Sequence, residues 1–185
     1  TIARNFRQPP DCHEYPGLER LVCFKLSPQT LETIRYVQQH SAPSDPVFIG
    51  LPRHDRIFVN AVTPYFVMNR PVPTKWHQFD PGLQTSSPIQ QEMVDELRRV
   101  QPRLVIIDDA GGFPHEPNES SLSSGVTVLD DYLLQTYATT AVFGRSKVLV
   151  IRGKTMPLRS SGDAAGPATH VVSACAPDRA RCGPH

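Results

Sequence analysis

The stretch from Ser87 to Asp109, SPIQQEMVDELRRVQPRLVIIDD, constrains the fold more than any other part of the chain. Its first half carries the signals of a capped amphipathic helix. The Ser87 side chain can accept a hydrogen bond from a free N–H of the first turn, and Pro88 suits that turn because it has no N–H to leave unbonded. The apolar residues that recur at helical spacing are Ile89, Met93, Leu97 and Val100.

The second half of this stretch predicts a strand. Pro102 stops the helix, and residues 104–107, LVII, form a continuous apolar run with β-branched side chains, typical of a strand covered on both faces. Asp108 and Asp109 follow at its carboxyl end, where open α/β sheets bind their ligands. Because adjacent side chains of an extended chain point to opposite faces, we expect only one of these carboxylates to face a crevice.

A second helix-then-strand unit precedes this one. Ser27 and Pro28 repeat the helix-start signal, the apolar spacing continues to about His40, and residues 46–50, PVFIG, predict a short buried strand. Two such units favour a parallel sheet, because a helix is the common crossover between parallel strands.

Near its end, the foldable part of the chain predicts a closing hairpin. Residues 141–143 and 147–151 are strand-like and flank a turn at Gly144-Arg145. The expected fold is therefore of the α/β class, a three-layer αβα arrangement with a mainly parallel sheet and an antiparallel C-terminal hairpin.

The other segments set the expected domain boundaries. Residues 1–26 form a lead-in segment with one edge strand at 21–24, residues 27–152 form the α/β domain, and residues 153–185 form a disordered tail rich in Pro, Gly and Ala. Within the domain we expect a helix over about 60–68, with Tyr65, Phe66 and Met68 packed inward, and another over 126–139. Residues 74–85 and 110–125 are expected to be long polar loops, a type that often binds ligands.

Composition excludes several classes of partner. Nineteen Lys and Arg against eighteen Asp and Glu give a net charge of +1, so no overall field recruits nucleic acid. No apolar run reaches the roughly 18 residues of a membrane span, so we expect the isolated chain to be soluble.

The chain begins at Thr1 without Met, so it is either a processed product or a segment of a longer protein. The spacing of Cys12, Cys23, Cys175 and Cys182 matches no zinc motif, and disulfides or free thiols both remain possible.

Polar residues gather after the first strand. Arg53, His54 and Asp55 follow it directly, and Asn60 comes soon after. An arginine there can pair with a phosphate or carboxylate, while His54 and Asp55 can act as acid, base or orienting groups. The alternative is that these side chains only satisfy the backbone of the loop.

The loop around residues 115–121, HEPNESS, together with Asp130 and Asp131, can supply acceptors and donors to a sugar or a metal. Its spacing matches no metal motif, and no metal or cofactor is expected. The chain also has no GxSxG, Walker, GxGxxG or HExxH sequence, which lowers the expectation of a self-sufficient enzyme.

Several loop motifs in one order resemble a known family. These are FIGLPRHDRIFVNAVTPYFVMNRPVPTKWHQFDPGLQTSSPIQQEMVDEL, then EPNESSLSSGVTVLDDYL, then YATTAVFGRSKVLVIR. Together they are similar to the soluble C-terminal extracytoplasmic domain of bacterial GT-C membrane glycosyltransferases, which are dolichyl-phosphate-mannose-protein mannosyltransferase-like. The similarity covers about Ser27 to Arg152.

This resemblance implies an accessory domain on the extracytoplasmic, periplasmic face of the membrane. It would assist binding of a lipid-linked sugar donor or a glycan acceptor, beside the membrane portion of the parent enzyme. The catalytic acidic residue of such enzymes lies in the membrane portion, so the resemblance transfers no catalytic residue to this chain. The residues that match the family's motifs, and that we take as binding candidates, are Arg53, His54, Asp55, Asn60, Arg70, Asp80, Gln84, Glu116, Asn118 and Asp130. Gly82, Gly125 and Tyr137 also match the motifs, and the resemblance implies no known role for them.

Two other functions stay open at this point. One is a free-standing small α/β hydrolase or transferase, which predicts that Asp55, Asp108 and His115 converge on one pocket. The other is a non-catalytic interaction domain, favoured by the lack of catalytic motifs.

Overall fold

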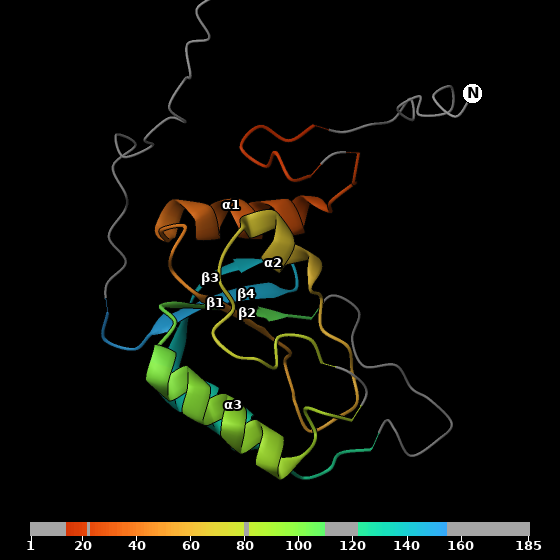
Figure 1. Cartoon of the computed structure of the whole chain (residues 1–185), viewed down its shortest axis with the longest axis vertical. Coiled ribbons are helices and arrows are strands. Elements are labelled where there is room, and N and C mark those ends of the chain that lie inside the picture. The colour runs from red at the N-terminus through yellow and green to blue at the C-terminus, as the bar shows by residue number, and fades with distance from the viewer. Residues whose placement is uncertain (1–13, 22, 80–81, 110–121, 155–185) are drawn as a thin grey trace, which may run out of the picture.

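The computed structural model describes residues 14–21, 23–79, 82–109 and 122–154. Within these residues the chain forms one four-stranded sheet with helices on both faces (Figure 1). The elements in chain order are α1 (Pro28–His40), β1 (Val47–Gly50), α2 (Thr63–Met68), α3 (Ser87–Val100), β2 (Leu104–Asp108), α4 (Val128–Thr136), β3 (Tyr137–Phe143) and β4 (Ser146–Ile151).

The sheet has the strand order β1-β2-β4-β3. β1 and β2 pair in parallel, whereas β4 pairs antiparallel with both β2 and β3. The α/β class and the closing hairpin are therefore confirmed. The sheet is mixed and not mainly parallel as expected: one strand pair is parallel and two are antiparallel, because β4 of the hairpin occupies the position beside β2 that a further crossover strand would take.

Alternating side chains of the strands build a core on each face of the sheet. Val47 and Ile49 of β1 pack with α1 and α2, while Phe48 packs with α3 and α4. β2 alternates in the same way, with Ile106 on the first face and Val105 on the second. Figure 1 shows α1 and α2 on one side of the sheet and α3 on the other. This is the expected three-layer arrangement.

The two helix-then-strand units form as the sequence indicates. In α1 the Ser27 hydroxyl accepts a hydrogen bond from the Thr30 N–H at 3.1 Å. α3 is capped by Ser86, one residue before the expected Ser87, through the backbone alone. It ends where Gln101 takes a left-handed conformation just before Pro102.

The helix after β1 differs from its prediction. α2 begins at Thr63 instead of about residue 60, because Pro64 fits only in the first turn of a helix. Tyr65 and Met68 are buried as expected. Phe66 is 58% exposed, so the prediction that it packs inward is wrong, and Val67 is buried in its place.

The helix predicted over residues 126–139 is shorter than expected. α4 ends at Thr136, and the next residues join β3, because Tyr137 pairs with Ile151 of β4. The buried Tyr137 hydroxyl also donates to the Pro102 carbonyl at 3.0 Å. β3 therefore begins four residues earlier than the predicted hairpin strand. Gly144, with φ +58°, supplies the left-handed turn to β4.

The described part of the lead-in segment packs on the α1–α2 face. Leu18 and Leu21 are buried in its apolar core, and the Arg20 guanidinium lies 5.5 Å from the centre of the Phe66 ring. The predicted edge strand at 21–24 is wrong for Leu21, Cys23 and Phe24, which are not in a strand; Val22 and the tail from residue 155 lie outside the described residues. In the part of the chain that the structure describes, no helix is both long and apolar enough to cross a membrane.

Candidate functional site

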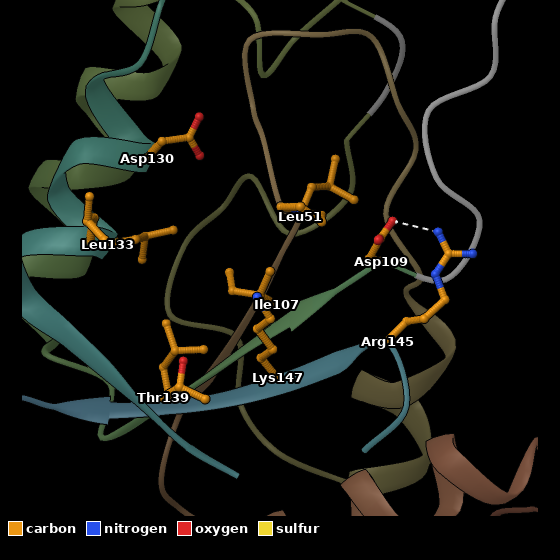
Figure 2. A pocket seen from close by; sticks show the side chains of 11 residues that line it. Leu51, Ile107, Asp109, Asp130, Leu133, Thr139, Arg145 and Lys147 are labelled. Carbon is orange, nitrogen blue, oxygen red and sulfur yellow. Dashed lines mark ion pairs between the residues drawn. The ribbon is translucent and has the colours of Figure 1, made fainter. Parts of the chain in front are cut away.

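A pocket of about 370 Å³ opens beside α4, at the carboxyl ends of β1 and β2 (Figure 2). Leu51 follows β1, Ile107 lies near the end of β2, and Leu149 comes from β4, so these side chains form an apolar floor. Leu133 and Leu134 of α4 form one wall. The pocket is thus located where open α/β sheets bind ligands.

Four charged side chains stand around this floor. Arg145, in the turn before β4, pairs with Asp109 at 3.2 Å, and Lys147 projects from β4 beside Ile107 (Figure 2). Lys147 makes no ion pair with any residue that the structure describes. Asp130 reaches the pocket from the first turn of α4. The pocket therefore combines an aliphatic surface with charged groups of both signs.

The His54 ring lies behind this site and is fully buried. Its Nε2 accepts the Leu51 N–H at 3.1 Å, so Nδ1 carries the proton and donates to Asp130 at 2.6 Å. The His54 backbone N–H donates to the second Asp130 oxygen at 3.0 Å. Both ring nitrogens are thus occupied inside the protein, and in this arrangement the ring cannot take a proton from a ligand.

Asp55 links the loop after β1 to the segment before α4. Arg53 Nε donates to its carboxylate at 2.9 Å, the Ser123 hydroxyl donates as well, and the Asp55 carbonyl accepts the Ser124 N–H at 2.8 Å. Burial acts to raise the pKa of Asp55, but the hydrogen bonds from Arg53 and Ser123 outweigh it and hold the pKa below its ordinary value.

Asn60 and Gln84 bind backbone groups in the loops between β1 and α3, and both are buried. The Asn60 amide donates to the His77 carbonyl at 2.9 Å, and its oxygen accepts the Phe79 N–H at 2.9 Å. Gln84 donates to the carbonyls of Arg56 and Phe58 at 2.9 and 2.8 Å. These contacts hold two irregular segments together. 

Gln90 of α3 was not predicted as a site residue, although its side chain joins several of the loops around the site. Its buried amide donates to the carbonyls of His54, Gln84 and Val126 at 3.1, 2.7 and 3.1 Å, and its oxygen accepts the Leu129 N–H at 2.9 Å. The signal was its position within the apolar stripe of the helix, three residues before Met93, where a polar side chain must find partners inside the protein.

The remaining binding candidates are dispersed. Arg70 donates to the Ser41 hydroxyl at 2.9 Å and to the Ser41 carbonyl at 3.1 Å, away from the pocket residues. Of the seven candidates that the structure describes, only Asp130 lines the pocket, and whether any of the ten binds a ligand stays a prediction. Asp80, Glu116 and Asn118 lie outside the described residues.

The two carboxylates at the end of β2 point to opposite faces, as expected. Asp109 lines the pocket beside α4, whereas Asp108 accepts the Ser146 hydroxyl at 2.7 Å and faces α1. Arg145 and Lys147 were not predicted as site residues. Their signal is indirect: they stand in the hairpin, and only the pairing of β4 with β2 brings them to this edge. Among the described residues, no three His, Cys, Asp or Glu side chains gather in a way that could hold a metal ion.

Comparisons with known proteins include a weak structural likeness. No family model matches the sequence, and no curated protein matches it. Among solved structures, the chain is similar to the C-terminal globular domain of an oligosaccharyltransferase from Archaeoglobus fulgidus, with a TM-score of 0.38 and 11% sequence identity. The match covers 70% of this chain and 100% of that one. At this TM-score we draw nothing about function from it.

Proposed function

We propose that the chain is an accessory extracytoplasmic domain of a polyprenyl-phosphate-sugar-dependent membrane glycosyltransferase. It assists binding of the acceptor or the lipid-linked donor, and the membrane portion of the parent enzyme carries out the transfer. The observation that carries the proposal is a pocket at the carboxyl ends of β1 and β2 whose neighbouring acid–base groups are already bonded within the protein.

A catalytic base needs a free atom within hydrogen-bond reach of the proton it takes. His54 has neither exposure nor a free nitrogen, Asp109 is ion-paired with Arg145, and both oxygens of Asp130 accept hydrogen bonds from His54. Each of these groups already has a partner within the protein, which favours a role in holding a ligand. This fits the loop-motif resemblance, in which the catalytic residue belongs to the membrane portion.

The extracytoplasmic location has independent support from one cysteine. Cys23 is disulfide-bonded, and disulfides form and persist mainly in oxidising compartments such as the periplasm. A thiol that stays reduced when the protein is made in its own host would contradict this location.

The direct test is a transfer assay with the purified chain and polyprenyl-phosphate sugars. We expect no turnover, and we expect the reading frame upstream of Thr1 to encode many apolar helices with an acidic residue in the first outer loop. Sugar transfer by the purified chain, or an upstream frame without membrane helices, overturns the proposal.

The rival hydrolase or transferase requires Asp55, Asp108 and His115 to converge. His115 lies outside the described residues. Asp108 faces α1 and bonds to Ser146, whereas Asp55 bonds to Arg53 and Ser123. The two described carboxylates thus share neither a pocket nor a partner, which counts against that function.

A further inference from the structure

The charged side chains that line the pocket are two carboxylates and two cations, and the two cations keep donors for a ligand. Asp109 is paired with Arg145, and the oxygens of Asp130 are directed to His54. Lys147 has no ion-pair partner among the described residues, and one terminal nitrogen of Arg145 lies 3.2 Å from an Asp109 oxygen. Because a guanidinium has five N–H donors, Arg145 can bind an anion while it keeps this pair.

The spacing of the two cations suits one shared anion. Arg145 stands in the turn before β4, and Lys147 follows two residues later within β4 itself. Both line the pocket (Figure 2). Long side chains at this separation can converge on the oxygens of a single phosphate group.

The floor of the pocket is aliphatic. Leu51, Ile107 and Leu149 contribute it, and none of the described lining residues is aromatic. Flat aromatic groups gain from aromatic partners, whereas a branched hydrocarbon chain gains from any buried apolar area. Leu134 continues the same surface outward and is 71% exposed. A chain lying on the floor can therefore leave the pocket over Leu134.

The geometry points to a ligand that is an aliphatic phosphate ester, with its phosphate on Lys147 and Arg145 and its first branched carbons on Leu51, Ile107 and Leu149. The volume of about 370 Å³ lies near the lower end of small-molecule sites, roughly 300–1,000 Å³, and suits a head group with the start of a chain. In its biological setting the inference rests on the proposed function: it makes the domain a holder of the lipid-linked side of the reaction, not of the acceptor.

Binding is tested by titrating the ¹⁵N-labelled chain with geranyl phosphate, inorganic phosphate, geraniol and hexose 1-phosphate. Geranyl phosphate should bind at least about tenfold more tightly than inorganic phosphate, since the chain adds buried apolar area. The amide signals that move should be those of residues 107, 133–134 and 147–149. If inorganic phosphate or hexose 1-phosphate binds as tightly as geranyl phosphate, the site recognises only the phosphate group. If geraniol binds as tightly as geranyl phosphate, the site recognises only the hydrocarbon chain. Either result overturns the assignment.

Two variants test the phosphate contact and the hydrocarbon contact separately, and a third serves as a matched control. Lys147→Gln should lower the affinity for geranyl phosphate about tenfold or more, because it removes a charge-assisted hydrogen bond. Leu134→Ser should lower the affinity for geranyl phosphate a few-fold and leave the affinity for inorganic phosphate unchanged. Lys154→Gln changes an exposed lysine beyond β4 and should change neither. Lys147 is exposed, so its variant should keep the fold, which circular dichroism checks. Unchanged affinity in Lys147→Gln overturns the inference.

The outcomes distinguish the two proposals. If geranyl phosphate does not bind, while the purified chain shows no transfer and the upstream frame encodes membrane helices, only the ligand assignment fails. If geranyl phosphate binds but the purified chain transfers sugar, the accessory role fails and the ligand assignment stands.

Discussion

The α3–β2 unit buries mostly apolar side chains, whereas the segment between β1 and α3 buries polar side chains alongside apolar ones. In the unit, the buried groups are chiefly apolar, such as Leu97 and Val105. In the segment, the buried side chains of Asn60 and Gln84 form hydrogen bonds with backbone groups. Regular elements satisfy their own backbone and can be covered with hydrocarbon, whereas irregular backbone must be satisfied by side chains.

Gln90 stands where the two regions meet. It occupies the same face of α3 as Leu97, yet it bonds to the loops and not to the sheet. The pocket lies at the same boundary, since Leu51 begins the irregular segment and Ile107 belongs to β2. Apolar packing thus places the floor of the site, and polar bonds place the loop beside it.

The largest effect should come from the apolar region. Leu97→Ala removes a fully buried side chain between α3 and the sheet, and should lower the free energy of unfolding by about 4 kcal/mol, within a usual range of roughly 2–5. Urea denaturation measures this. Leu134→Ala, on the exposed face of α4, is the control and should change stability by less than about 0.5 kcal/mol. Equal losses in both variants would mean that α3 is not packed as described.

Gln90→Met keeps the size of the side chain but removes its polar bonds. The carbonyls of His54, Gln84 and Val126 lose a donor, so we expect a loss of about 3 kcal/mol. Hydrogen exchange should show the loss concentrated in residues 51–58 and 122–129. Its neighbour Gln91 is exposed and bonds to the exposed Asp95, so Gln91→Met should be near neutral. A uniform loss of hydrogen-exchange protection over the whole chain would show that the two regions are not stabilised separately.

Asn60→Ala tests the irregular segment alone. The Phe79 N–H loses its acceptor and the His77 carbonyl loses a donor, which should cost about 2 kcal/mol. The Phe79 amide should then exchange faster while amides of α3 keep their protection. Faster exchange in α3 of equal size would show that the two regions unfold as one unit.

The smallest effect should come from Asp55, and it depends on pH. Its pKa is lower in the folded chain than its ordinary value, so the unfolded state takes up the proton first and acid favours unfolding. This contribution is present above about pH 4 and is lost as the pH falls through the lower folded pKa. In Asp55→Asn that part of the acid loss should be absent. At neutral pH the cost should stay below about 1 kcal/mol, because its partner Arg53 is 49% exposed.

Arg53→Gln provides the companion measurement. It removes the main donor to Asp55, so denaturation across pH should again show a reduced acid loss. The double variant should add little to either single one, since both remove the same interaction. Full additivity would mean that Ser123 and burial, and not Arg53, determine the behaviour of Asp55.

Much of the fold was predictable because its signals are local. The apolar spacing of α3, the proline after it and the apolar run of β2 all fall within 23 residues, and the structure confirms them. The opposite directions of Asp108 and Asp109 also followed from the period of a strand. Boundaries that depend on a distant partner were missed, as at Tyr137, which leaves α4 to pair with Ile151.

The candidate site was less predictable than the fold. His54 and Asp130 matched the loop motifs separately, but they bond across 76 positions of sequence, and nothing in their spacing indicates it. Lys147 is an exposed residue of a strand that alternates buried and less buried positions. Its place beside Ile107 depends on the insertion of β4 between β2 and β3.

The sequence by itself determined the helix-then-strand units, the two-faced core and the carboxylates at the end of β2, because each follows from the period of a single element. Only the tertiary structure decided that the sheet is mixed, that the buried polar residues bond to distant loops, and that two cations stand over an aliphatic floor. These features arise from contacts between segments far apart in the chain, and local spacing carries no record of them.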